Sequence, residues 1–211
     1  AAMQFALAPV VGALSDAVGR RPVLLLSVLG LGIDHALTAL SPNITWLFVG
    51  RLVAGGFGAS FATANAYITD VTPPEERGQA FGKLGAAFGL GFILGPALGG
   101  VLGDVGHRVP FFVAAGLSLM NFAYGLVVLP ETHPRERRTR FQLSQANPLA
   151  ALRAIPGGAV VRPLAIALFV FFLANSVYPA IWGFYTTERY GWTPRTIGIS
   201  LATYGIVSAI V

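Results

Sequence analysis

Long apolar runs, separated by short polar loops, constrain the fold of this chain more than any other feature. Of its 211 residues, 55% are hydrophobic and only 11% are charged, and the mean hydropathy is +0.68. A helix of about 20 apolar residues spans the hydrocarbon core of a bilayer. The runs cover residues 1–14, 23–40, 44–68, 81–102, 109–129, 164–185 and 197–211. The sequence therefore predicts an all-α integral membrane protein with about seven transmembrane helices, the first and last of them short.

The positive charges lie mainly on one side of these predicted helices. If the loop at residues 12–22 is cytoplasmic, ten of the 14 lysines and arginines fall on the cytoplasmic side and three on the other, while Arg51 falls within a helix. The positive-inside rule favours this orientation. The net charge of +5 then reflects orientation in the membrane, so we expect lipid and no nucleic acid as a partner.

One long polar stretch, residues 130–163, divides the chain, and it carries six arginines and two glutamates. We interpret it as a cytoplasmic linker between part of an N-terminal transmembrane bundle of five helices (1–129) and the start of a C-terminal bundle of two helices (164–211). Asn147 and Pro148 predict the start of a short helix on the membrane surface within this linker. Both chain ends fall inside apolar runs, so we expect a longer protein that supplies the missing helices.

Two ionisable residues lie well inside predicted helices, where charge is costly and usually functional. Asp34 shares a helical face with Ser27, Gly30 and Thr38, and this small and polar stripe suits the interior of a bundle. We therefore expect Asp34 to exchange a proton or to contact a cationic substrate, with a purely structural ion pair as the alternative. Arg51 lies about two turns into its helix and should attract acids or the substrate.

A short charged loop joins the first two predicted helices, and further charges follow the third apolar run on the same predicted side. We expect these groups to form a network that closes the cytoplasmic face and breaks when the two bundles rock. A single exposed ion pair contributes only about 0–1 kcal/mol, but several pairs can bias a two-state equilibrium whose gap is a few kcal/mol. The residues of this predicted gating loop are Gly12, Asp16, Gly19, Arg20, Arg21, Asp70 and Arg77.

The predicted helix at 81–102 carries glycines at four-residue spacing. Gly91, Gly95 and Gly99 share one face, which another helix can approach closely, and Gly100 follows directly. Pro96 removes one backbone hydrogen bond and predicts a kink. A bent, tightly packed helix of this kind can act as a seal on which two bundles pivot.

Enzyme motifs are missing from the sequence. It contains no G-x-x-x-x-G-K-[ST] phosphate loop, no H-E-x-x-H zinc helix and no G-x-S-x-G nucleophile elbow. It also contains no cysteine, which excludes thiolate metal sites within it. We predict that the chain is not an enzyme and holds no cofactor or metal ion of its own.

The charged loop resembles the signature loop of the major facilitator superfamily of transporters, and residues 91–100 resemble the glycine-proline motif associated with its antiporters. Along nearly the whole chain, the sequence is similar to the bacterial tetracycline-efflux transporters of that superfamily. The matching stretches are Gly12-Ala-Leu-Ser-Asp16, Gly19-Arg-Arg-Pro-Val-Leu-Leu25, Gly50-Arg51, Ala66-Tyr-Ile with Asp70, Gly95-Pro96 with Gly99-Gly100, Pro110-Phe-Phe112, Leu129-Pro-Glu131, Asn147-Pro-Leu-Ala150 and Thr196-Ile-Gly-Ile-Ser-Leu-Ala202.

This resemblance implies a partial helical bundle, corresponding to helices two to eight, in the bacterial cytoplasmic (inner) membrane. It also implies a secondary active transporter. Such a transporter exports a tetracycline-type drug, as a chelate with a divalent cation such as Mg²⁺, in exchange for protons by alternating access. By the same resemblance, Asp34 matches an intramembrane acid that family members require, and Arg51 matches an arginine linked to proton transfer.

Several positions depart from the family pattern, namely Ala17, His35, Gly56, Phe57, Ser60 and Phe61. Because most of these lie on the cavity side of the fourth family helix or beside Asp34, they bear on the substrate more than on the fold. Two alternatives therefore stay open: an exporter of the same architecture for another amphipathic drug or metabolite, and a membrane fragment that does not transport.

Overall fold

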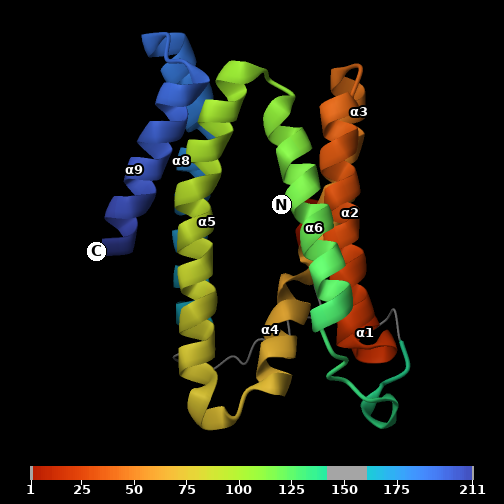
Figure 1. Cartoon of the computed structure of the whole chain (residues 1–211). Helices are drawn as coiled ribbons and strands as arrows, with labels where there is room; N and C mark the ends of the chain where they lie inside the picture. The colour runs from red at the N-terminus through yellow and green to blue at the C-terminus, as the bar shows by residue number, and fades with distance from the viewer. Residues whose placement is uncertain (1, 142–160, 211) are drawn as a thin grey trace. The chain divides into compact units, whose positions relative to one another are not determined.

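Helices make up most of the structure, a computed structural model that describes residues 2–141 and 161–210 (Figure 1). Within these residues there are helices and loops but no strand. The α-helices are α1 (Ala2–Val18), α2 (Arg20–Leu40), α3 (Ile44–Phe57), α4 (Phe61–Val71), α5 (Arg77–Val105), α6 (Val109–Val128), α8 (Val161–Tyr190) and α9 (Pro194–Ile210). Each predicted apolar run corresponds to one of these helices, except that a 3-10 turn, Gly58–Ser60, separates α3 from α4. The prediction of an all-α chain is confirmed.

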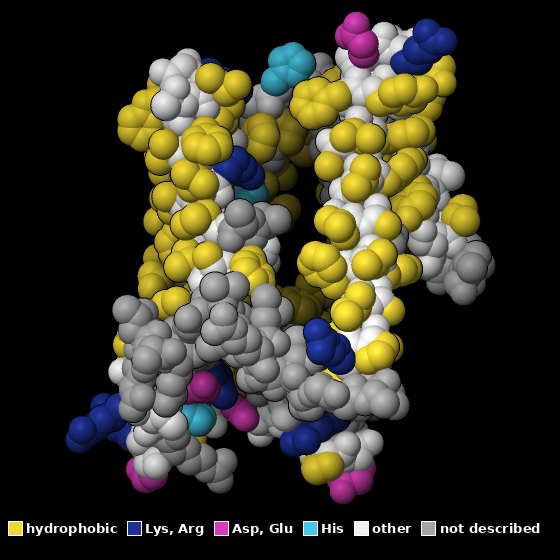
Figure 2. Space-filling view, turned by 180° about the vertical axis from the view of Figure 1, so that it is seen from behind, with side chains coloured by type: hydrophobic (Ala, Val, Ile, Leu, Met, Phe, Trp, Pro, Cys, Tyr) yellow, Lys and Arg dark blue, Asp and Glu magenta, His cyan; other side chains and the backbone are white. Residues whose placement is uncertain are grey.

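Five helical stretches are long and apolar enough to cross a membrane: Arg20–Leu40, Ile44–Val71, Pro74–Val105, Val109–Val128 and Val161–Tyr190. The remaining helices, α1 and α9, have 17 residues each. Hydrophobic side chains cover the helix surfaces, while most charged side chains gather near the helix ends (Figure 2). An apolar surface this extensive fits a lipid environment. The structure therefore agrees with a multi-pass membrane protein.

Contacts divide the chain into two units, and the first comprises residues 1–81 and 111–153. Its central helix is α2, which contacts α1, α3 and α4. On another side α6 packs against α2, where Leu119 lies against Gly32 and Leu25 lies against Gly125. In the most apolar stretch of α2, 39% of the residues are buried, against 6% or less in the corresponding stretches of the other spans. The other helices of this unit therefore enclose α2.

The second unit comprises residues 82–110 and 154–211, and therefore most of α5 together with α8 and α9. Aromatic side chains join α8 to α9: the rings of Tyr178 and Tyr204 lie 5.1 Å apart, and the indole N–H of Trp182 donates to the hydroxyl of Ser200 at 2.9 Å. The ring of Phe92 on α5 meets Tyr204 edge-on. Aromatic contacts therefore link these three helices, and a part-buried hydrogen bond adds to the contact between α8 and α9.

The division at residues 130–163 stays a prediction. Residues 130–141 follow α6 as a loop with a single 3-10 turn, Arg135–Arg137. The predicted surface helix at Asn147 and Pro148 lies outside the described residues. Contacts group most of α5 with α8 and α9, whereas the predicted bundles follow chain order.

Candidate functional site

Asp34 and Arg51 form an ion pair between two apolar helices. A terminal nitrogen of Arg51 on α3 lies 2.9 Å from Oδ2 of Asp34 on α2. The same nitrogen donates to the hydroxyl of Thr38 at 2.8 Å. The Asp34 side chain is 3% exposed and that of Arg51 is 52% exposed. One charge of the pair is therefore enclosed by protein, while the other can reach the space beside the helix.

Local sequence explains how these three side chains meet. Asp34 and Thr38 are four residues apart, so they lie on one face of α2. The side chain of Asn43 caps α3 by accepting a hydrogen bond from the backbone N–H of Trp46 at 3.1 Å, which fixes where α3 begins. Arg51 then faces α2 about two turns into α3. The predicted stripe is confirmed as the buried face of α2, because Ser27, Gly30, Asp34 and Thr38 are all buried.

His35 takes no part in this pair. Its Nδ1 lies 2.5 Å from the backbone carbonyl of Leu31, as expected for a histidine that makes a local hydrogen bond. Within the described residues, no three acidic, histidine or cysteine side chains are placed to hold a metal ion.

The charged loop between α1 and α2 forms a second polar site. The guanidinium of Arg20 pairs with Asp16 one turn earlier and with Asp70 at the end of α4, at 3.4 Å. It also donates to the hydroxyl of Ser15 at 2.7 Å. The side chain of Arg20 is only 13% exposed, so this arginine is the centre of the network.

Glu131, just after α6, completes this network, and sequence analysis did not select it. Its Oε1 accepts hydrogen bonds from the backbone N–H groups of Arg20, Thr132 and His133, each at 3.0 Å. Burial alone would raise the pKa of Glu131, but these N–H groups and that of Arg21 together hold it below its ordinary value. Glu131 thereby caps the positive end of α2, which has no side-chain cap of its own.

Gly19 makes room for this cap. Its φ of 119° is a conformation that side chains other than glycine rarely adopt, and a Cβ at this position would fall on the carboxylate of Glu131. The sequence feature that could have indicated this contact is that α2 begins after Gly19, without a Ser, Thr, Asp or Asn cap. The free N–H groups at such a helix start need an acceptor from another part of the chain. The sequence alone could not show which acid supplies it.

The other predicted loop residues bind backbone groups. Arg21 donates to the carbonyl of Leu126 near the end of α6 at 2.7 Å. Arg77 donates to carbonyls at the end of α4, those of Thr69 and Thr72, each at 3.4 Å. Of the residues expected in the network, Asp16 and Asp70 each form an ion pair with Arg20. Arg21 and Arg77 instead donate hydrogen bonds to backbone carbonyls at helix ends. Gly12 lies within α1, with open space where a Cβ would point.

The glycine-rich helix α5 packs on α9 at Gly100, a member of the predicted glycine-proline motif. A Cβ at Gly100 would lie 2.7 Å from the carbonyl oxygen of Pro194, and a Cβ at Gly198 would fall on the carbonyl of Pro96. At Gly91, Gly95 and Gly99 a Cβ would meet nothing within 4 Å among the described residues. The predicted packing of these three glycines against another helix stays a prediction, and α5 continues through Pro96 as one helix.

This sequence and fold are similar to those of known proteins. The profile of the Major Facilitator Superfamily matches residues 1–211. The tetracycline resistance protein of class C from Escherichia coli is 43% identical over 210 residues, which are 100% of this chain and 53% of that protein. The class B protein from the same organism is 36% identical over 100% of this chain and 52% of its own length.

A solved structure agrees with these sequence matches. The human organic anion transporter MFSD10 (TETRAN) superposes with a TM-score of 0.76 at 28% identity, over 98% of this chain and 52% of that one. The chain thus spans about half the length of the relatives it matches. Because the family profile covers every residue of the sequence, the chain belongs to the Major Facilitator Superfamily.

Proposed function

We propose that this chain is part of a proton-coupled antiporter of the bacterial cytoplasmic membrane that exports a tetracycline-type drug. The observation that carries the proposal is the Asp34–Arg51 pair, a buried carboxylate held by a half-exposed guanidinium inside apolar helices. Ionisable groups at such positions mark ion and substrate pathways. Similarity to tetracycline resistance proteins along the whole chain supports the choice of drug.

The geometry gives each of the three polar side chains a role in this proposal. While Asp34 is ionised, its Oδ2 accepts a hydrogen bond from the guanidinium of Arg51 and keeps that group against α2. When Asp34 takes up a proton, the charge attraction is lost, and only the hydroxyl of Thr38 still accepts from Arg51. The half-exposed guanidinium is then available to an acidic group of the substrate. The ionised carboxylate of Asp34 and an acidic group of the substrate thus compete for one arginine, so the protonation state of Asp34 is coupled to substrate contact.

The network around Arg20 supplies the second part, a lock at the cytoplasmic face. It joins the start of α2 to the ends of α1, α4 and α6 through Asp16, Asp70 and Glu131. A group of ion pairs that forms in one state only can bias an alternating-access equilibrium. The substrate in this proposal is the drug chelated to a divalent cation such as Mg²⁺, and the chain's own residues hold no resident metal.

Transport in inverted membrane vesicles tests the proposal. Vesicles that contain the full natural protein should accumulate tetracycline in the presence of Mg²⁺ when a proton gradient is applied, and a protonophore should abolish the accumulation. Asp34→Asn should abolish it as well, because an amide cannot gain or lose the proton. The matched control is Asp104→Asn, which makes the same chemical change at an exposed position at the end of α5.

Normal drug accumulation by the Asp34→Asn protein would contradict the assigned role of Asp34. Orientation is tested separately with cysteines at Thr139 and Thr187, both exposed. A thiol reagent that cannot cross the membrane should reach the cysteine at 139 only from the cytoplasm and the cysteine at 187 only from outside. The reverse pattern would overturn the cytoplasmic placement of the lock.

A second candidate function is export of another amphipathic drug or metabolite by the same mechanism. The similarity to a human organic anion transporter supports this candidate, because the half-exposed guanidinium of Arg51 can bind any acidic group. Accumulation of an amphipathic organic anion, with no accumulation of tetracycline in the same vesicles, would select this candidate. If neither compound is transported, the chain acts as a membrane component without transport activity.

A further inference from the structure

One carboxylate oxygen of Asp34 has no partner. Oδ2 binds Arg51, but Oδ1 is buried without a hydrogen bond to any described residue. Buried polar atoms nearly always find a partner, either in the protein or in an ordered water. For a carboxylate that is 3% exposed, the missing partner points to a ligand that donates a hydrogen bond.

A cavity of about 390 Å³ lies beside this oxygen, between α2 and α3. It extends from Asp34 and Gly50 to Ser41 and Pro42 in the loop that joins the two helices. Gly50 keeps the way to Oδ1 open, because a Cβ there would lie 3.1 Å from this oxygen. A water takes up about 30 Å³ in the liquid and needs polar partners. The cavity is therefore large enough for several waters, and Asp34, Thr38 and Ser41 offer them polar partners in an otherwise largely apolar lining.

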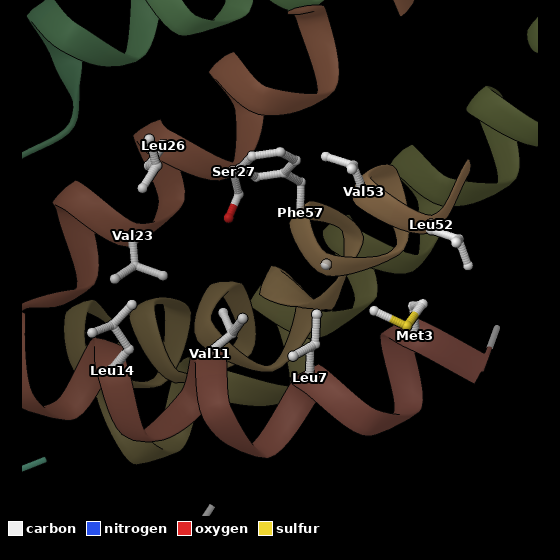
Figure 3. A pocket seen from close by; sticks show the side chains of 11 residues that line it. Met3, Leu7, Val11, Leu14, Val23, Leu26, Ser27, Leu52, Val53 and Phe57 are labelled. Atoms are coloured by element: carbon white, nitrogen blue, oxygen red, sulfur yellow. The ribbon is translucent and has the colours of Figure 1, made fainter. Parts of the chain in front are cut away.

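Phe57 closes the cavity at its deep end. Its ring lies directly on Gly30, where a Cβ would overlap the ring atoms. Beyond it lies a second cavity of about 410 Å³, which shares only Val53 and Phe57 with the first. In this second cavity Phe57 and Ser27 form one wall, and Leu7 and Val11 of α1 lie opposite (Figure 3). The ring of Phe57 thus lies between the two cavities along α2.

We propose that the cavity beside Asp34 is a water-filled access path through which protons reach Asp34 from the α2–α3 loop, and that Phe57 seals it on the cytoplasmic side. The ligand is water and hydronium. In the transfer step, a hydronium ion loses a proton to Oδ1 of Asp34, an O–H bond forms there, and neutral water remains. This inference rests on the proposed function, which assigns proton exchange to Asp34 and places the α2–α3 loop outside the cytoplasm.

Few charged groups compete for that proton. From α3, only Arg51 faces Asp34, and it binds the other oxygen. On α2, the neighbouring His35 is engaged with the carbonyl of Leu31. From α6, the side chains that lie against this part of α2 are Ser118 and Leu119, which do not titrate. Among the described residues that line the cavity, Asp34 is the one titratable group.

Cysteine accessibility tests the path directly, since the chain has no cysteine of its own. Val49 is 46% exposed and lines the cavity, whereas its neighbour Phe48 is 64% exposed and does not line it. A small cationic methanethiosulfonate reagent added outside intact cells should label the Val49→Cys protein, because a thiol in contact with water ionises. The Phe48→Cys protein, at the same depth but outside the cavity, should stay unlabelled. An unlabelled Val49→Cys protein would mean that lipid fills the cavity, and it would overturn the inference.

The seal has its own test in the second cavity. The Ser27→Cys protein should resist the same reagent, and the added substitution Phe57→Ala should make it reactive. Labelling of Ser27→Cys with Phe57 in place would overturn the role of Phe57 as a seal, and so would continued protection in the Phe57→Ala background. Both labelling experiments measure whether water reaches the introduced thiol, and neither requires the protein to transport a substrate. A protein that labels as expected but transports nothing would therefore refute the proposed function and leave the water path standing.

A transport measurement completes the test. Gly50→Ala should lower the rate of proton-driven export by about tenfold, since its methyl group displaces the water that satisfies Oδ1. Gly116→Ala is the matched control: a glycine of the membrane helix α6 with nothing within 4 Å of its Cβ position, whose substitution should leave the rate unchanged. Equal rates in both variants would contradict the assignment of this cavity to proton access.

Discussion

Two regions among the described residues bring carboxylates and arginines together, and these regions differ in how many other groups share the charge. Within the apolar helices, Asp34 has one arginine and one unpaired oxygen. At the start of α2, Glu131 accepts three backbone hydrogen bonds and lies 3.8 Å from Arg138, and the Arg20 network beside it contains two more acids. The first arrangement leaves a carboxylate that depends on a single partner. The second distributes its charge and holds a loop in one conformation.

Surroundings also set the energy of each region. A pair enclosed by apolar side chains interacts strongly, and the loss of one partner leaves an uncompensated charge. Exposed pairs are screened by water and salt, and each contributes little. The same two side-chain chemistries therefore form a pair that depends on one partner in the first region and a shared network in the second. The following predictions test this contrast through the free energy of unfolding, measured in detergent micelles, from the largest expected effect to the smallest.

Arg51→Leu should have the largest effect, a loss of about 3 kcal/mol, because it leaves the buried charge of Asp34 without its partner. Adding Asp34→Asn should recover most of that loss, since the buried charge is then removed as well. A double-mutant cycle measures this coupling. Additive effects of the two substitutions would show that the pair is not energetically linked, and the contrast between the regions would fail.

Gly19→Ala should cost about 2 kcal/mol, because alanine rarely adopts a φ of 119° and its Cβ would fall on the Glu131 carboxylate. The control is Gly12→Ala in α1, where a Cβ has open space and alanine favours the helix. Similar stabilities of the two variants would argue against the observed conformation of the α1–α2 loop.

Glu131→Gln should cost about 1 kcal/mol at neutral pH, as expected for the loss of a helix cap. Since the folded protein lowers the pKa of Glu131 below its ordinary 4.5, the stabilisation is complete above that pH and is lost as the pH falls through the lower folded value. The variant should therefore lack this part of the acid-induced loss of stability. Glu136→Gln, an exposed residue of the same segment, provides the control. An unchanged pH profile in the Glu131 variant would remove its role as a cap.

Asp16→Asn should have the smallest effect, about 0.5 kcal/mol or less, because Asp16 is 45% exposed and Arg20 keeps Asp70 as a partner. The effect should shrink further at high salt, where surface charges are screened. A cost as large as that of Arg51→Leu would show that the surface network is coupled as strongly as the buried pair.

Several features of this protein follow from its sequence alone. The apolar runs determine the helices, because each needs only its own composition and length. Short spacing along one helix also predicts which side chains share a face, as with Ser27, Asp34 and Thr38 on α2. Charge inside an apolar run identifies Asp34 and Arg51 as candidates without any knowledge of their partners.

Only the tertiary structure decided which of these groups meet. Asp34 and Arg51 are 17 residues apart and on different helices, and Glu131 reaches the backbone of Arg20 across 111 positions. The sequence also did not show that Gly100 of α5 would meet Gly198 of α9. A helix pattern records which faces can be buried, but the partner of each face depends on how the helices pack, and packing is a property of the whole chain.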